Sequence, residues 1–117
     1  MNLKTWLASL STLPVLTDFL PDKPDDCIRV RGYGGTPLPH LGKDNRSVQF
    51  LFRATDAAVA HDAAWSVYRA LDPPPVVTEA GGGKYIVRPK QPPFFLQRDV
   101  SSRSEYVFNA SILGAPD

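Results

Sequence analysis

The sequence predicts an α+β domain in which two amphipathic helices pack on a four-stranded, mostly antiparallel or mixed sheet, in the order α-β-β-α-β-β. Two segments carry apolar residues at helical spacing, and four others alternate as strands do. The 12 prolines stand between these segments, which is typical of stiffened loops in a compact domain. A chain of 117 residues has the size of one domain, so we expect residues 1–117 to form a single unit.

Each predicted helix has one apolar stripe. The first helix is expected over residues 2–13, ended by Pro14, and its stripe is Leu3, Trp6, Leu7, Leu10 and Leu13. The second is expected to begin at a cap on Thr55 or Asp56 and to end near Leu71, before three consecutive prolines. Its stripe is Ala57, Ala60, Ala64, Val67, Tyr68 and Leu71. We expect both stripes to pack on the sheet.

The four expected strands are 25–33, 46–54, 84–88 and 103–113. Cys27, at the start of the first strand, is expected to be a buried core residue. As the only cysteine it cannot form an intrachain disulfide, so packing must hold the fold, which fits a reducing cytoplasm.

Two stretches between these elements are candidates for contacts. Residues 32–45 contain four glycines and two prolines, which predicts a long loop from about Tyr33 to Asn45. Loops of that length in small domains are usually functional or disordered. The second stretch is Phe94-Phe95-Leu96 with Arg98, an aromatic cluster beside an arginine, as in interface anchors. The alternative is that both phenylalanines cover the end of the local core.

The charge balance disfavours several classes of function. The 13 basic and 12 acidic residues give a formal net charge of +1, without the basic excess of nucleic-acid binders or of membrane-surface proteins. No apolar run approaches the roughly 20 residues of a membrane-spanning helix. A small nucleic-acid-binding module remains a less favoured alternative. It requires four arginines to share one sheet face with aromatic residues: Arg29, Arg31, Arg46 and Arg53.

The sequence lacks motifs of catalysis and of metal binding. The two histidines, His40 and His61, lie far apart, and neither C-x-x-C nor H-E-x-x-H occurs. The glycine-rich stretches fail the spacing of a phosphate-binding loop. We interpret the adjacent carboxylates Asp25 and Asp26 as solvated charges. We therefore predict no enzyme activity, no cofactor and no metal site.

Four stretches, taken in order and spacing, resemble the tail-terminator proteins, or minor capsid (neck) proteins, of long-tailed bacteriophages. They are 30–37 (VRGYGGTP), 47–53 (SVQFLFR), 63–71 (AAWSVYRAL) and 91–99 (QPPFFLQRD), the last followed by YVFN at 106–109. The resemblance covers most of the chain from residue 30 onward.

This resemblance implies a structural virion protein without catalysis or cofactor. Such proteins form a homo-oligomeric ring, commonly a hexamer, on the end of the tail tube. The ring stops tube growth and presents a surface to the head-completion (stopper) proteins, so the implied partners are further copies, the tail-tube protein and the stopper. DNA passes through the lumen without sequence-specific binding, and no membrane is involved. The implied location is the virion neck, a head–tail connection, after assembly in the host cytoplasm; a head-completion protein is the alternative.

A ring subunit needs two different contact patches, because each copy meets its neighbours through unlike surfaces. We expect one patch in the predicted loop, at Tyr33, Gly34, Gly35, Thr36, Pro37, Leu38 and His40. We expect the other at Phe94, Phe95, Leu96 and Arg98.

Overall fold

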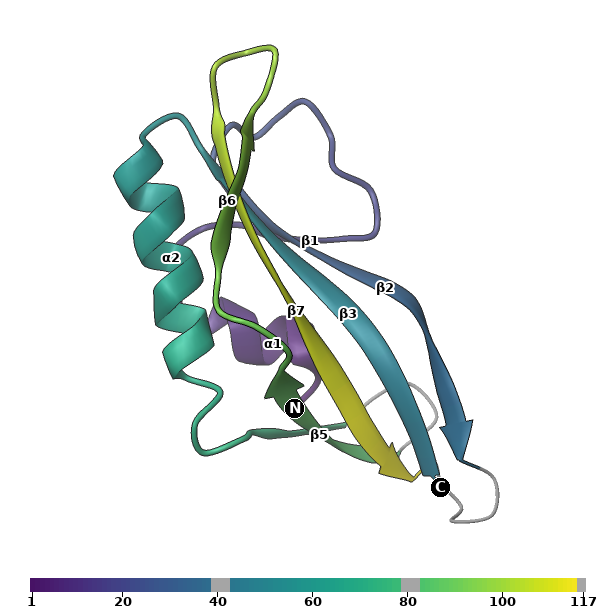
Figure 1. Cartoon of the computed structure of the whole chain (residues 1–117). Coiled ribbons are helices and arrows are strands. Elements are labelled where there is room, and N and C mark those ends of the chain that lie inside the picture. Colours follow the sequence, from purple (N-terminus) through teal and green to yellow (C-terminus); the bar gives the residue numbers. More distant parts are fainter. Residues whose placement is uncertain (39–42, 79–82, 116–117) are drawn as a thin grey trace.

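The computed structural model of the chain describes residues 1–38, 43–78 and 83–115 (Figure 1). These residues contain two helices, α1 (Leu3–Ala8) and α2 (Ala57–Arg69). They also contain seven strands: β1 (Val15–Thr17), β2 (Cys27–Leu38), β3 (Lys43–Ala54), β4 (Val76–Thr78), β5 (Lys84–Pro89), β6 (Phe94–Arg98) and β7 (Ser104–Ala115).

The strands form one sheet in the order β1-β2-β3-β7-β5-β4, and β6 also pairs with β7. All neighbours are antiparallel except β1, which runs parallel to β2. The three central strands, β2, β3 and β7, have 12 residues each. The strand β7 pairs with β3 along one edge. Along its other edge β7 pairs with β6 near the start of β7 and with β5 near the end of β7.

The predicted α+β class is confirmed, with few helices and a dominant sheet, but the predicted four strands and their order are wrong. The strands β1 and β4 have three residues each, too few for an alternating pattern to be recognised. The strand β6 shows no alternation because all five of its residues are exposed. The described residues therefore follow the order α-β-β-β-α-β-β-β-β.

The stretch predicted as a long loop is mostly strand. The hairpin of β2 and β3 continues, past a register shift after Gly32, as far as Leu38 opposite Lys43. Glycine and proline predicted a loop here, but a bulged strand tolerates them when its partner holds the pairing. The predicted loop 33–45 is therefore wrong for most of its length, and His40 lies outside the described residues.

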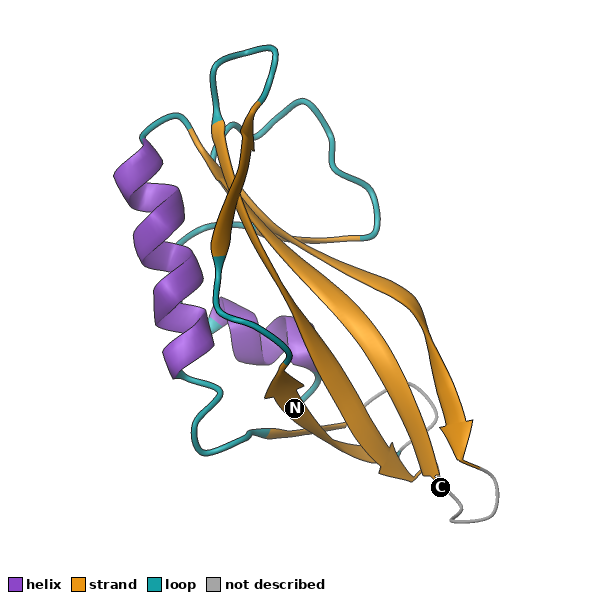
Figure 2. Cartoon of the chain, in the orientation of Figure 1, coloured by secondary structure: helices purple, strands orange, loops and turns teal. Residues whose placement is uncertain are grey.

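The core lies between one face of the sheet and the two helices (Figure 2). Phe50, Phe52 and Phe108 of the central strands are fully buried there. The ring centroid of Phe108 lies 5.0 Å from that of Phe50 and 5.9 Å from that of Phe52. Rings at these distances contact one another and form the centre of the core.

The second helix, α2, closely follows its prediction. Asp56 is its N-cap, and the carboxylate accepts a hydrogen bond from the Ala58 amide at 2.9 Å. Its buried residues, Ala60, Ala64 and Val67, belong to the predicted stripe. Two of them are alanines, which lets the helix backbone approach the phenylalanines of the sheet.

The first helix is shorter than predicted, because α1 ends at Ala8. The hydroxyl of Ser9 donates to the Trp6 carbonyl at 2.6 Å, a local bond that competes with helix continuation. Leu10 and Leu13 still pack against the core, although they lie outside the helix. The stripe thus identified the right core residues but placed the end of the helix wrongly.

The helix α1 contacts both β1 and β4, which stand at opposite ends of the strand order. Leu3 and Leu7 are buried in the core, and the Met1 carbonyl accepts a hydrogen bond from the Thr78 amide of β4 at 2.8 Å. A sheet whose two outer strands touch one helix must curl around it. The sheet therefore has a concave face that holds both helices and a convex face without a helix (Figure 2).

Candidate functional site

The edge strand β6 presents apolar side chains to solvent. Phe94, Phe95 and Leu96 are 44%, 52% and 46% exposed. Within the described residues β6 pairs only with β7, so the backbone groups of its other edge are open. Large exposed apolar residues on an open edge are typical of protein–protein contact sites. Both phenylalanines are about half exposed, so each offers apolar surface to a partner even if its other half covers the core.

A chain of aromatic rings holds Phe95 in place. Its ring centroid lies 5.5 Å from that of Tyr106 on β7, and Tyr106 lies 5.5 Å from His61 on α2. His61 in turn lies 6.2 Å from Trp65. A side chain already ordered in the free protein loses less entropy on binding, so Phe95 is suited to anchor a partner.

Phe94 and Phe95 lie on opposite faces by ordinary strand alternation, and β6 becomes irregular after Phe95. Phe94 stands opposite Val107 on the convex face, whereas Phe95 stands opposite Tyr106 on the concave face. The register shifts between Phe95 and Gln97, so Leu96 is the extra residue of a bulge. The strand thus offers apolar groups in several directions.

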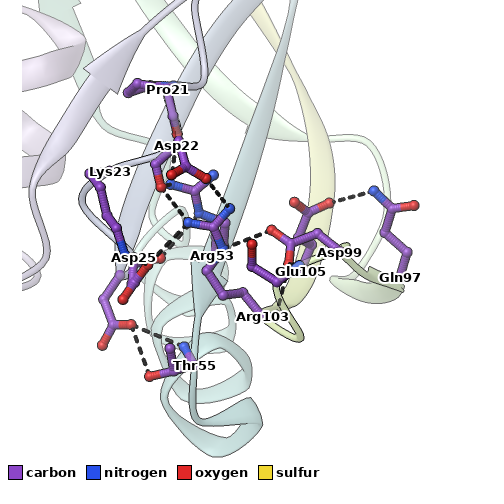
Figure 3. Close-up of polar contacts among 12 residues, drawn as sticks. Pro21, Asp22, Lys23, Asp25, Arg53, Thr55, Gln97, Asp99, Arg103 and Glu105 are labelled. Atoms are coloured by element: carbon purple, nitrogen blue, oxygen red, sulfur yellow. Dashed lines mark hydrogen bonds and ion pairs between the residues drawn. The ribbon is translucent and has the colours of Figure 1, made fainter.

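Beyond β6, a buried arginine holds the 18–26 segment, the connection between β1 and β2, against the end of the sheet (Figure 3). Arg53 of β3 is 2% exposed. Its guanidinium donates to four main-chain carbonyls of the segment at 2.6 to 3.3 Å: Pro21, Asp22, Pro24 and Asp25. Arg53 thereby binds four points along a connection that contains no described helix or strand.

A second buried arginine, Arg103, joins the same segment to the β6–β7 turn (Figure 3). Its guanidinium contacts the Asp99 carboxylate at 2.8 Å, Asp25 at 3.1 Å and Asp22 at 3.2 Å. Asp26 accepts a hydrogen bond from a backbone amide of the β3–α2 connection. The interpretation of Asp25 and Asp26 as solvated charges is therefore wrong. Sequence reasoning missed this cluster because Arg53 and Arg103 are 28 and 78 residues from Asp25.

The cluster lowers the pKa of two carboxyl groups. For Asp25 the largest cause is a hydrogen bond from Lys23, and the charges of Lys23 and Arg103 add to it. Burial tends to raise the pKa of Asp99, but hydrogen bonds from the amide and guanidinium of Arg103 and from the Ser101 amide together lower it. Both side chains therefore stay ionised to a lower pH than an ordinary aspartate does.

The other predicted contact residues lie along β2. Tyr33 is 44% exposed, and residues 34–38 continue the strand. β1 pairs with β2 only from Ile28 to Val30, so among the described residues the β2 edge is open from Arg31 onward. The structure does not bring the two predicted surfaces together. The β2 edge and β6 lie on opposite sides of the β3–β7 pair.

The arginines of the nucleic-acid alternative divide between the two faces. Arg29, Arg31 and Arg53 lie on the convex face, as their partners along β3 and β7 show. Arg46 lies on the concave face, where it donates to the Tyr85 hydroxyl at 3.0 Å. Because Arg53 is occupied by the 18–26 segment, the four arginines do not form one surface.

Little in the described part of the chain suggests catalysis. Across residues 1–38, 43–78 and 83–115, no group of three or more His, Cys, Asp or Glu side chains could hold a metal ion. Cys27 is fully buried, and burial raises the pKa of its thiol, which disfavours a nucleophile. No helix in these ranges is long and apolar enough to cross a membrane.

The fold and its surfaces define a class of protein: a small, sheet-dominated α+β chain with two open sheet edges, suited to contacts with other proteins. Over residues 7–114, the chain matches the family described as bacteriophage tail terminator protein. Because this match covers most of the chain, the protein belongs to that family, and the resemblance drawn from its sequence is confirmed. It is a structural protein of the phage tail. No curated protein matches the chain.

Proposed function

We propose that the protein forms a ring that caps the tail tube, ends its growth and joins it to the head-completion proteins in the virion neck. The observation that supports this proposal is the pair of open edges, β6 and the outer part of β2, on opposite sides of the sheet. A closed ring requires each copy to meet its neighbours through two different patches. Two unlike edges facing away from each other supply that arrangement.

The residues of each edge have distinct roles in this proposal. Phe94, Phe95, Leu96 and Arg98 form the apolar patch of one subunit, and Phe95 is its pre-ordered anchor. The second patch comprises Tyr33, Gly34, Gly35, Thr36, Pro37 and Leu38 on the β2 edge, together with His40, which follows this strand in the sequence. The tail-tube protein and the stopper bind the two opposite ends of the ring in this proposal.

The proposal also includes the number of domains, the number of copies in the ring and the path of the DNA. Residues 1–117 act as one domain, six copies close the ring, and DNA passes through its lumen without base-specific contacts. The protein works by assembly alone, as a non-enzymatic protein without a cofactor.

The direct test is to mix the purified protein with its tail-tube protein and to measure tube lengths by electron microscopy. Capping gives short tubes of uniform length with a ring at one end. A chain that stays monomeric in the mixture and leaves tube length unlimited contradicts the proposal. Deleting the gene separates the alternative, because loss of a terminator gives overlong tails, whereas loss of a stopper gives normal tails that remain unattached.

A variant on β6 tests the apolar patch itself. We expect Leu96→Glu to abolish ring formation and tube capping, because a carboxylate buried at an apolar contact is costly. Its stability should change by less than about 0.5 kcal/mol, as for most exposed positions. Val100→Glu is the matched control, since Val100 is fully exposed in the neighbouring turn. If both variants lose capping equally, or if neither loses it, β6 is not part of the ring contact.

A further inference from the structure

The convex face of the sheet carries rows of side chains with an excess of positive charge. Three rows cross the central strands: Cys27–Arg53–Glu105–Gln97, Arg29–Leu51–Val107–Phe94 and Arg31–Gln49–Asn109. The rows contain one carboxylate, Glu105, which accepts a hydrogen bond from Gln97 at 2.9 Å. Within the described residues, nothing in these rows neutralises the charge around Arg31.

Two arginines of β2 lie side by side on this face without a shared carboxylate. Arg29 is 8% exposed, its Nη2 donates to the Gln49 amide oxygen at 2.5 Å, and its buried Nε has no partner in the described structure. Burial lowers the pKa of Arg29 and the neighbouring charge of Arg31 lowers it further, while Glu105 acts in the opposite direction without reversing the shift. An anion placed beside this pair would be attracted by both guanidinium groups.

A third cation reaches the same place from the β5–β6 connection. The ammonium of Lys90 donates to the Ser47 hydroxyl at 2.6 Å and lies 5.5 Å from the centroid of the Tyr33 ring. Next to it, a cavity of about 160 Å³ is lined by Arg31, Tyr33, Gln49 and Asn109. The buried Asn109 Oδ1 also has no partner in the described part of the structure. We call these four residues and Lys90 the Arg31 surface.

We propose that the Arg31 surface binds the phosphate backbone of duplex DNA. Its side chains are those that contact phosphate in protein–DNA complexes: arginine, lysine, tyrosine, asparagine and glutamine. Tyr33 is the one aromatic residue among its five, whereas β6 groups three exposed apolar side chains, so we assign this surface to DNA and make an acidic protein an outcome of the test. The major groove admits a helix or a two-stranded ribbon but not the broad face of a sheet, so the contact reads no base sequence.

This inference rests on the proposed function for the source of the DNA, which is the genome passing through the ring. The DNA contact itself is argued only from the geometry of the convex face. The two proposals can fail separately, because DNA binding is measured on the chain alone and capping is measured on tubes.

The test is the binding of the intact protein to a fluorescent duplex of about 20 base pairs, measured by anisotropy at several salt concentrations. Two or three phosphate contacts predict an affinity loss of about 10- to 40-fold between about 50 and 200 mM salt. Duplexes of unrelated sequence should bind equally. Arg31→Gln combined with Lys90→Gln should weaken binding and lower the slope against salt by about two.

The matched control is Arg69→Gln combined with Lys84→Gln, which removes one arginine and one lysine, as the test pair does, but from α2 and β5. Circular dichroism of both double variants checks that they fold. The proposal is overturned if the duplex does not bind, or if the control pair loses as much affinity as the Arg31 and Lys90 pair. It is also overturned, in favour of an acidic protein segment, if Arg31→Gln with Lys90→Gln impairs tube capping while the unaltered chain binds no DNA.

Discussion

At the scale of single residues, Arg53 and Arg103 hold the 18–26 segment in place. In a regular strand, backbone hydrogen bonds to a neighbouring strand have this role. Arg53 satisfies four carbonyls that have no strand partner, and Arg103 supplies charge to two aspartates of the segment. A buried guanidinium is stable only when its donors are paired, so arginine and segment depend on each other. The segment lies beside the β6–β7 turn because Asp99 in that turn binds the same Arg103.

This cluster predicts a loss of stability in acid. The pKa values of Asp25 and Asp99 are lower in the folded chain than the ordinary value of 3.8. Their contribution to the free energy of unfolding is therefore complete above that value and disappears as pH falls through the lower folded values. We expect the denaturant midpoint of unfolding to fall steadily between about pH 5 and pH 2.

Asp99→Asn separates this effect from general acid denaturation. The variant keeps an oxygen for the amides of Ser101 and Arg103 but loses the charge that faces the guanidinium. At neutral pH it should be less stable by about 1–2 kcal/mol, and its stability should depend less on pH below about 4. Asp62→Asn, at a carboxylate that is 79% exposed on α2, serves as the control. An unchanged pH profile in Asp99→Asn contradicts the assignment.

At the scale of elements, the pairing of β5 with β7 depends on one glycine. Gly114 stands opposite Tyr85, and a Cβ at that position would collide with the Lys84 carbonyl and the Tyr85 ring. We expect Gly114→Ala to cost about 1–3 kcal/mol, because a backbone carbonyl cannot move aside as a side chain can. Gly32→Ala is the control, since a Cβ there meets nothing within 4 Å. Chemical denaturation measures both, and equal losses would refute this reason.

The helices and strands also differ in how well the sequence predicts them. The cap and stripe of α2 and the central strands were predictable, because each depends on local spacing and on one buried face. The extension of β2 through its glycines was not, since only pairing with β3 makes those residues a strand. The apolar stretch of β6 was identified as a candidate contact from composition alone. Its exposure depends on β7, which takes one edge and leaves the other open.

At the scale of the whole molecule, the curl of the sheet determines which surfaces are available. Helix α1 contacts both outer strands, so the helices fill the concave face. The convex face carries no described helix and is covered in part by the 18–26 segment. The molecule extends 47 Å along its long axis and 23 Å across, and the long central strands run through it. The open edges of β2 and β6 then face opposite ways, and the Arg31 surface lies between them on the convex face. The proposed DNA contact thus borders the proposed ring contact on β2, and Tyr33 belongs to both.

The curl itself should depend on Leu7, which is fully buried between α1 and the sheet. We expect Leu7→Ala to lower the free energy of unfolding by about 2–5 kcal/mol, through lost burial and the cavity that remains. Because α1 contacts β1 and β4 together, hydrogen exchange should show lost protection in both outer strands, while β3 and β7 stay protected. Leu96→Ala is the control, at a leucine that is 46% exposed. If β4 keeps its protection in Leu7→Ala, α1 covers only β1 and does not close the sheet.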